Sequence, residues 1–103
     1  MQLKLYSLKD LKTGVYLQPM PQRHDIEAQR ALVQLVATTD CTIARYPADY
    51  ELYYIGEFDD VTASLVPVSP VFIMNGITAV EHAKRDMQRF MGQPYDLASA
   101  ASA

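Results

Sequence analysis

Hydrophobic and polar residues alternate with a period of two near the start of the chain. Leu3 to Leu8 form the first such run, which predicts a strand with alternate side chains on opposite faces. After a turn, Val15 to Gln18 predict a short return strand. Pro19 and Pro21 are expected to stop this strand, because proline has no amide hydrogen for the sheet ladder. The chain is therefore expected to begin with a two-stranded ribbon.

A longer pair of strands is predicted in the middle of the chain. The alternation is strongest over Tyr50 to Phe58, and Leu65 to Asn75 returns as an edge-like strand that Pro67 and Pro70 interrupt. These two strands are expected to pair as a hairpin. The segment from Cys41 to Tyr46 predicts one more strand before them.

Two segments change to the helical period. Apolar residues recur at helical spacing from Ile26 to Ala37, which predicts the first helix. Thr78 and Glu81 fit a capping box, which predicts the start of a second helix, and Gly92 and Pro94 are expected to end it. This helix has an apolar stripe and a basic face opposite to it. The stripe comprises Val80, Ala83, Met87, Phe90 and Met91, and the basic face comprises His82, Arg85 and Arg89.

These elements predict an α+β fold, an antiparallel sheet with two helices packed on one face. The alternation along the strands requires that one face be covered, and the helices supply two apolar stripes that cover it. A partly open barrel of the OB type is the alternative, because the strands are many and short. A chain of 103 residues has room for one core, so residues 1–94 are expected to form a single domain and residues 95–103 a flexible Ala/Ser-rich tail.

Composition excludes several classes of protein. The chain is 50% hydrophobic and 20% charged, as in an ordinary globular protein. No apolar run reaches the roughly 18 residues that a membrane-spanning helix needs, and the N-terminal segment lacks the apolar region of a signal peptide. Cys41 has no partner for an intramolecular disulfide. We therefore expect a protein of a reducing cytoplasm with no membrane partner.

Residues that could carry catalysis or bind a metal are sparse. His24 and His82 lie far apart in the sequence, and neither is at metal-ligand spacing from Cys41. The glycines are scattered, so no phosphate-binding loop or dinucleotide motif can be assembled. A cysteine in an apolar segment is more often a small buried residue than a reactive thiolate. The sequence thus predicts a protein that is not an enzyme and has no metal or other cofactor.

Nucleic acid remains as a ligand class that fits the residues. A single strand is held by basic side chains along its backbone and by aromatic rings on which bases stack. The basic candidates are Lys4, Lys9, Lys12, Arg23, Arg30, Arg85 and Arg89, and the stacking candidates are Tyr6, Tyr16 and Tyr53. Tyrosines half-buried in a sheet and a solvated basic helix face are the structural alternatives.

The central hairpin is acidic. Residues 46–70 carry five acidic and no basic side chains, and the whole chain has a net charge of −3. Glu57, Asp59 and Asp60 at the hairpin end are the candidates for binding a partner protein, with a solvated turn as the alternative. A second copy is a further expected partner, because the edge strand Val71 to Met74 and an exposed Met and Phe stripe need cover.

Four segments together resemble a known family. They are KLYSLKDLKTGVY (4–16), RHDIEAQRALVQLV (23–36), YPADYELYYIGEFDD (46–60) and PVF (70–72). With them the chain resembles, over roughly residues 3–77, the small nonstructural protein of gokushovirus-type microviruses. These are tailless bacteriophages with small circular single-stranded DNA genomes. The most specific part is the phrase DYELYYIGEFDD.

The resemblance implies a protein made in the cytoplasm of the infected bacterium and absent from the mature particle. It also implies binding of single-stranded DNA in viral DNA replication, at the switch to single-strand synthesis and packaging. The family supplies no motif of DNA-contacting residues, so the candidates above come from this sequence alone. The alternative function is a protein-interaction module that engages host or viral replication or capsid proteins through the acidic hairpin.

Overall fold

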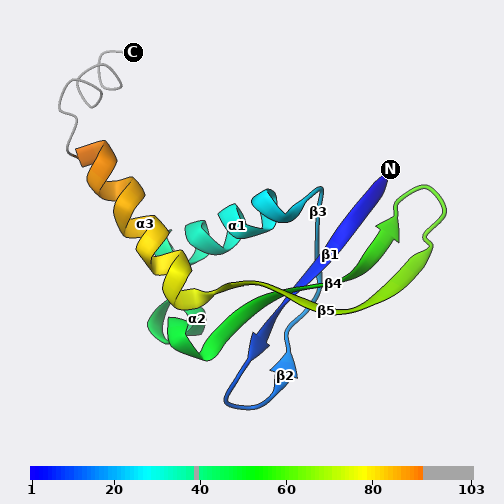
Figure 1. Ribbon diagram of the computed structural model, residues 1–103, viewed down its shortest axis with the longest axis horizontal. Coiled ribbons are helices and arrows are strands. Elements are labelled where there is room, and N and C mark those ends of the chain that lie inside the picture. Colours follow the sequence, from blue (N-terminus) through cyan, green and yellow to red (C-terminus); the bar gives the residue numbers. More distant parts are fainter. Residues whose placement is uncertain (39, 92–103) are drawn as a thin grey trace.

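The computed structural model describes residues 1–38 and 40–91, with side chains described as far as Met87 (Figure 1). This part holds an antiparallel sheet and three α-helices, which confirms the predicted α+β class. The strands are β1 (Gln2–Asp10), β2 (Val15–Tyr16), β3 (Met20–Gln22), β4 (Tyr50–Asp59) and β5 (Leu65–Asn75). The helices are α1 (Asp25–Thr38), α2 (Thr42–Arg45) and α3 (Gly76–Met91), and a 3₁₀ helix, η1 (Pro47–Asp49), precedes β4.

The strands lie in the order β2, β1, β4, β5, and β3 also pairs with β1. All pairings are antiparallel. The hairpin of β4 and β5 confirms the prediction for the middle of the chain. β5 spans Pro67 and Pro70 as one strand, but its register with β4 shifts between Pro67 and Val71, where the prolines were expected to interrupt it. Among the described residues no pairing joins β5 to β2 or β3, so the sheet is open and the alternative of an OB-type barrel is wrong.

The core lies between one face of the sheet and the helices. Leu8 is opposite Leu52, and Leu52 is opposite Met74, so these three side chains share one face. The buried apolar cluster comprises Tyr6, Leu8, Leu52 and Met74 of the sheet, Ala28 and Leu32 of α1, and Ala79 of α3. The predicted packing of both long helices on one face is therefore confirmed.

The segment predicted as the strand Cys41 to Tyr46 is instead the one-turn helix α2. The Arg45 amide donates to the Cys41 carbonyl at 3.0 Å, and the Tyr46 amide donates to the Thr42 carbonyl at 2.9 Å. The Arg45 guanidinium also donates two hydrogen bonds to the Asp40 carboxylate, at 3.0 and 3.2 Å. The prediction was wrong because a short apolar run has no periodicity that separates a strand from a helical turn.

The N-terminal ribbon extends further than its prolines indicated. β3 pairs Pro21 with Leu5 and Met20 with Tyr6, so pairing resumes where it was expected to stop. A strand that pairs on one side only tolerates a proline, because the missing amide hydrogen can lie on its unpaired side.

α3 begins at Gly76, two residues before the expected Thr78. The Asn75 side chain caps it, accepting a hydrogen bond from the Thr78 amide at 2.7 Å, so the predicted capping box is not what starts this helix. The helix leaves the end of β5 and its C-terminal part projects away from the sheet (Figure 1). The predicted helix end at Gly92 and Pro94 and the predicted tail 95–103 lie outside the described residues.

Candidate functional site

Three aromatic rings form a row across the face of the sheet opposite to the core, which we call the open face. Ser7, Tyr53 and Phe72 are neighbours across β1, β4 and β5, while Tyr16 of β2 lies opposite Lys9. The ring centroids of Tyr16 and Tyr53 are 5.7 Å apart, and those of Tyr53 and Phe72 are 5.9 Å apart. We call Tyr16, Tyr53 and Phe72 the aromatic row.

The aromatic row is accessible to solvent. Tyr16 is 37% exposed and Phe72 is 50% exposed, and Tyr53 lies half-buried between them. Successive rings meet edge to face, with interplanar angles of 72° and 79°. Because the three rings do not stack in parallel on one another, the row leaves ring surface for planar ligands.

Charged groups contact two rings of the row, Tyr16 and Tyr53. The Lys9 ammonium lies 5.5 Å from the centroid of the Tyr16 ring, within the range of a cation–π contact. The Tyr53 hydroxyl donates to the Glu51 carboxylate at 2.8 Å, and this hydrogen bond, together with burial, raises the pKa of Tyr53. The hydrogen bond to Glu51 helps to hold the Tyr53 ring in place. Lys12, in the turn after β1, is exposed.

The open face continues as an aliphatic surface beyond the row. Leu3, Phe58 and Leu65 are neighbours across the same three strands, and Leu65 is 66% exposed. The open face thus has an aromatic part, with Lys9 at its Tyr16 end, and an aliphatic part toward the hairpin end.

Tyr6 does not belong to the open face, and its predicted role in base stacking is wrong. Its ring is fully buried in the core under α1. Its hydroxyl donates to the Asp25 carboxylate at the start of α1. Burial and this hydrogen bond raise the pKa of Tyr6. A strand exposes its two faces alternately, and Tyr6 lies on the face that the helices cover.

We expect Tyr6→Phe to lower the free energy of unfolding by about 1 to 2 kcal/mol, because it removes a hydrogen bond to a carboxylate that water can partly replace. Urea denaturation followed by circular dichroism measures this change. Tyr46→Phe is the matched control, since Tyr46 is 58% exposed and should lose almost nothing. Equal stability of the two variants would contradict a structural role for the Tyr6 hydroxyl.

The basic candidates are spread over the molecule. Lys4 lies on the helix side of the sheet, where its ammonium is 3.9 Å from the Asp25 carboxylate and 5.3 Å from the Tyr54 ring centroid. Arg23 precedes α1, and its guanidinium lies 3.9 Å from the Glu27 carboxylate. Two further candidates, Arg30 of α1 and Arg85 of α3, are exposed on helices, and the side chain of Arg89 lies outside the described residues.

The predicted DNA-binding residues are therefore brought together only in part. Lys9, Tyr16 and Tyr53 gather on one side of the sheet, with Lys12 in the adjoining turn. Lys4, Arg23, Arg30 and Arg85 do not join them.

The acidic hairpin end uses some of its carboxylates within the chain. The Met1 ammonium donates to the Asp60 carboxylate at 2.6 Å. Asp59 accepts a hydrogen bond from the Val61 amide at 2.9 Å, and such backbone hydrogen bonds lower the pKa of Asp59. Glu57 is half-buried and lies opposite Lys4 on the helix side of the sheet.

Phe72 is the residue of the site that sequence reasoning missed. It lies in the predicted edge strand Val71 to Met74, but nothing local indicates that its ring adjoins Tyr53. The only sequence feature that could have indicated this site was an aromatic residue on a strand predicted to pair with Tyr50 to Phe58.

A protein family described as Phage ORF5 protein matches residues 3–81 of the chain. The chain belongs to this family. No curated protein and no solved structure matches it. The matched segment of this Phage ORF5 protein includes the whole aromatic row together with Lys9 and Lys12. The resemblance to a small phage protein is thus confirmed at the level of the family.

Two further findings concern the described part of the chain. None of its helices over residues 1–38 and 40–91 is long and apolar enough to cross a membrane. Within the same residues, no group of three or more His, Cys, Asp or Glu side chains could hold a metal ion.

Proposed function

We propose that this phage protein binds single-stranded DNA on the open face of its sheet, without catalysis. Bases stack on Tyr16, Tyr53 and Phe72, while Lys9 and Lys12 contact the phosphates. The observation that carries the proposal is the aromatic row itself, in which rings from three strands lie 5.7 and 5.9 Å apart on an accessible face. Such rings suit any base, because every base has a flat face to stack.

The distribution of charge supports this location despite the net charge of −3. Phosphates need cations only where the strand runs, and two lysines lie at the Tyr16 end of the row. Three acidic side chains of the hairpin, Glu57, Asp59 and Asp60, lie toward its far end, where Asp60 already binds the Met1 ammonium. The other two are engaged at the lysine end, where Glu51 accepts the Tyr53 hydroxyl hydrogen bond and the Asp49 carboxylate lies 4.0 Å from the Lys12 ammonium. A DNA strand that follows the row across the sheet stays away from the far end of the hairpin.

The family gives the proposed activity a biological setting. The chain resembles the nonstructural protein of gokushovirus-type microviruses, whose genomes are single-stranded DNA. This resemblance supports a role at the switch to single-strand synthesis and packaging in the host cytoplasm. Phosphate contacts and stacking carry little base information, so we expect weak sequence preference.

The test is a titration of a labelled oligonucleotide with the full chain, followed by fluorescence anisotropy. Phe72→Ala should weaken binding by about 5- to 100-fold, the effect of losing one stacked base. Val71→Ala is the matched control, because Val71 is similarly exposed at 47% but points to the opposite face of the same strand. Two phosphate contacts predict a roughly sevenfold loss of affinity between about 50 and about 200 mM salt.

Three outcomes of this titration would count against the proposal. Absence of binding at low salt would refute it and direct the search for a partner to Glu57, Asp59 and Asp60. If Phe72→Ala and Val71→Ala changed the affinity for the oligonucleotide equally, the DNA would not bind on the open face. The double variant Lys9→Ala/Lys12→Ala could bind the oligonucleotide as tightly as the wild type while Arg85→Ala binds it more weakly. That result would place the phosphates on α3 instead.

A further inference from the structure

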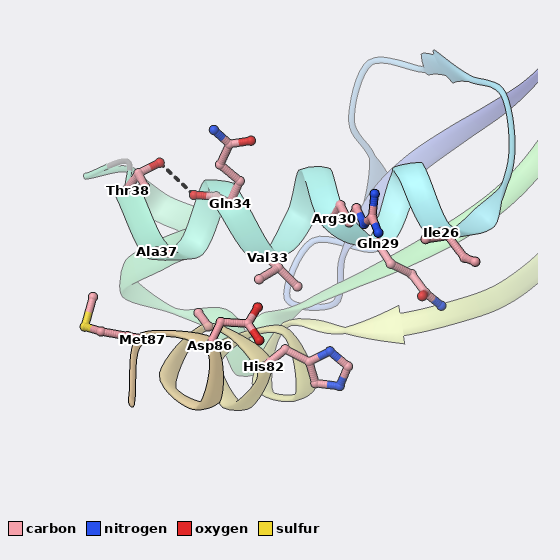
Figure 2. Close-up of a pocket in the computed structure, with 11 residues that line it drawn as sticks. Ile26, Gln29, Arg30, Val33, Gln34, Ala37, Thr38, His82, Asp86 and Met87 are labelled. Carbon is pink, nitrogen blue, oxygen red and sulfur yellow. Dashed lines mark hydrogen bonds between the residues drawn. The ribbon is translucent and has the colours of Figure 1, made fainter. Parts of the chain in front are cut away.

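A groove runs between α1 and α3 on the helix side of the molecule (Figure 2). Its volume is about 760 Å³. Val33 of α1 and Asp86 of α3 point into the space between the two helices (Figure 2). The groove lies on the other side of the sheet from the aromatic row, so it is separate from the proposed DNA-binding face.

The α1 wall of the groove is a second apolar face of that helix. Ala28 and Leu32 turn toward the sheet and are buried in the core. Ile26, Val33 and Ala37 turn toward the groove instead, at intervals of seven and four residues, and Ile26 is 55% exposed. Apolar residues at this spacing form one stripe along a helix, as in a seam that packs against another helix.

The α3 wall contributes a projecting apolar residue. Ala79 near the start of α3 is fully buried, whereas Met87, two turns later, is 61% exposed and lines the groove. α3 thus packs against the body of the molecule at its beginning and projects beyond it. A projecting helix with an exposed methionine can enter a groove of the kind that it borders.

The two walls carry opposite charges. Arg30 lies on the α1 wall and Asp86 on the α3 wall. Among the side chains that the structure describes, neither forms an ion pair. A partner that covered the groove with apolar groups alone would bury both charges without compensation, which is strongly unfavourable. The occupant must therefore bring an anion to Arg30 and a cation to Asp86.

We propose that the occupant is a second copy of this chain, related by a two-fold axis. In such a pair Arg30 of each copy meets the partner's Asp86, and two equivalent contacts related by the axis satisfy all four charges. Met87 of each copy packs against the apolar stripe Ile26, Val33 and Ala37 of the other. Four helices, an α1 and an α3 from each copy, then form the interface, and both open faces stay accessible.

The test is sedimentation of the full chain at about 50 µM, where a specific pair should sediment at twice the 11.6 kDa chain mass. Arg30→Asp alone, and Asp86→Arg alone, should each weaken the dimer by at least about tenfold, because like charges then meet at both contacts. An equimolar mixture of the two variants should dimerise again. In a mixed pair, one copy has an acidic residue at both position 30 and position 86 and the other has a basic residue at both, so opposite charges meet at each contact. An ion pair within one copy cannot produce this recovery.

Arg85→Asp is the matched control, because Arg85 is exposed on α3 and does not line the groove. It should leave the dimer intact, and circular dichroism should show the same helix content in all variants. A monomeric wild type at this concentration would overturn the proposal. A dimer that neither groove variant weakens, or a mixture that stays monomeric although each variant is folded, would also overturn it.

Discussion

Gly76→Ala is expected to lower the free energy of unfolding by about 3 kcal/mol, more than Gly14→Ala in the same chain. Gly76 is buried where β5 passes into α3, and a β-carbon at this position would lie 2.0 Å from the Pro47 carbonyl oxygen of η1. The nearest atoms all belong to the Pro47 backbone, at 2.0 to 2.9 Å. No side chain can rotate away, so η1 or the start of α3 must shift.

The measurement is urea denaturation, with Gly14→Ala as the matched control. Gly14 has a φ of +75°, and a β-carbon added there would have no other atom within 4 Å, so alanine at this position is strained but not crowded. That strain costs about 1 to 2 kcal/mol. Gly76→Ala could lower the free energy of unfolding by no more than Gly14→Ala does. That result would show that η1 and α3 can move apart at little cost.

Tyr53→Leu/Phe72→Leu is expected to weaken binding of single-stranded DNA by about 100-fold, because two stacking rings are lost while apolar side chains remain. Leucine keeps the face apolar and cannot offer a flat ring. This double variant therefore separates base stacking from general hydrophobic contact. Anisotropy titration at low salt measures the change, and circular dichroism checks that the sheet is retained.

Tyr46→Leu is the control for loss of a tyrosine as such, since Tyr46 is exposed and lies between α2 and η1, outside the aromatic row. Its affinity for DNA should equal that of the wild type. If the double leucine variant binds as tightly as the wild type, the rings do not stack bases and the proposed site is wrong.

Elements with a long, regular pattern were predictable from the sequence. The alternation over Tyr50 to Phe58 located β4 within one residue, and helical spacing located α1 to within one residue at each end. Short segments were not predictable, because Cys41 to Tyr46 holds too few residues for a period to show. Its helical turn is accompanied by an ion pair between Asp40, before the turn, and Arg45, the last residue of the turn.

The candidate site was predictable by residue type but not by position. Tyr6 and Tyr16 both belong to the ribbon, yet one is fully buried and the other accessible, because alternation does not reveal which face the helices cover. Phe72 joins Tyr53 through a register that shifts between Leu52 and Tyr53. Such a shift exchanges the faces of the residues beyond it, and it depends on pairing that the local sequence does not encode.

The edge strand β5 has a consequence for how copies of the protein can associate. An unpaired edge invites strands of other molecules, and repeated addition leads to open-ended fibres. Pro67 and Pro70 remove two amide donors from this strand within four residues. A foreign strand laid along β5 would find fewer hydrogen-bond donors there, so the sheet resists polymerisation. In the dimer proposed above, association through the helices instead stops at a closed pair.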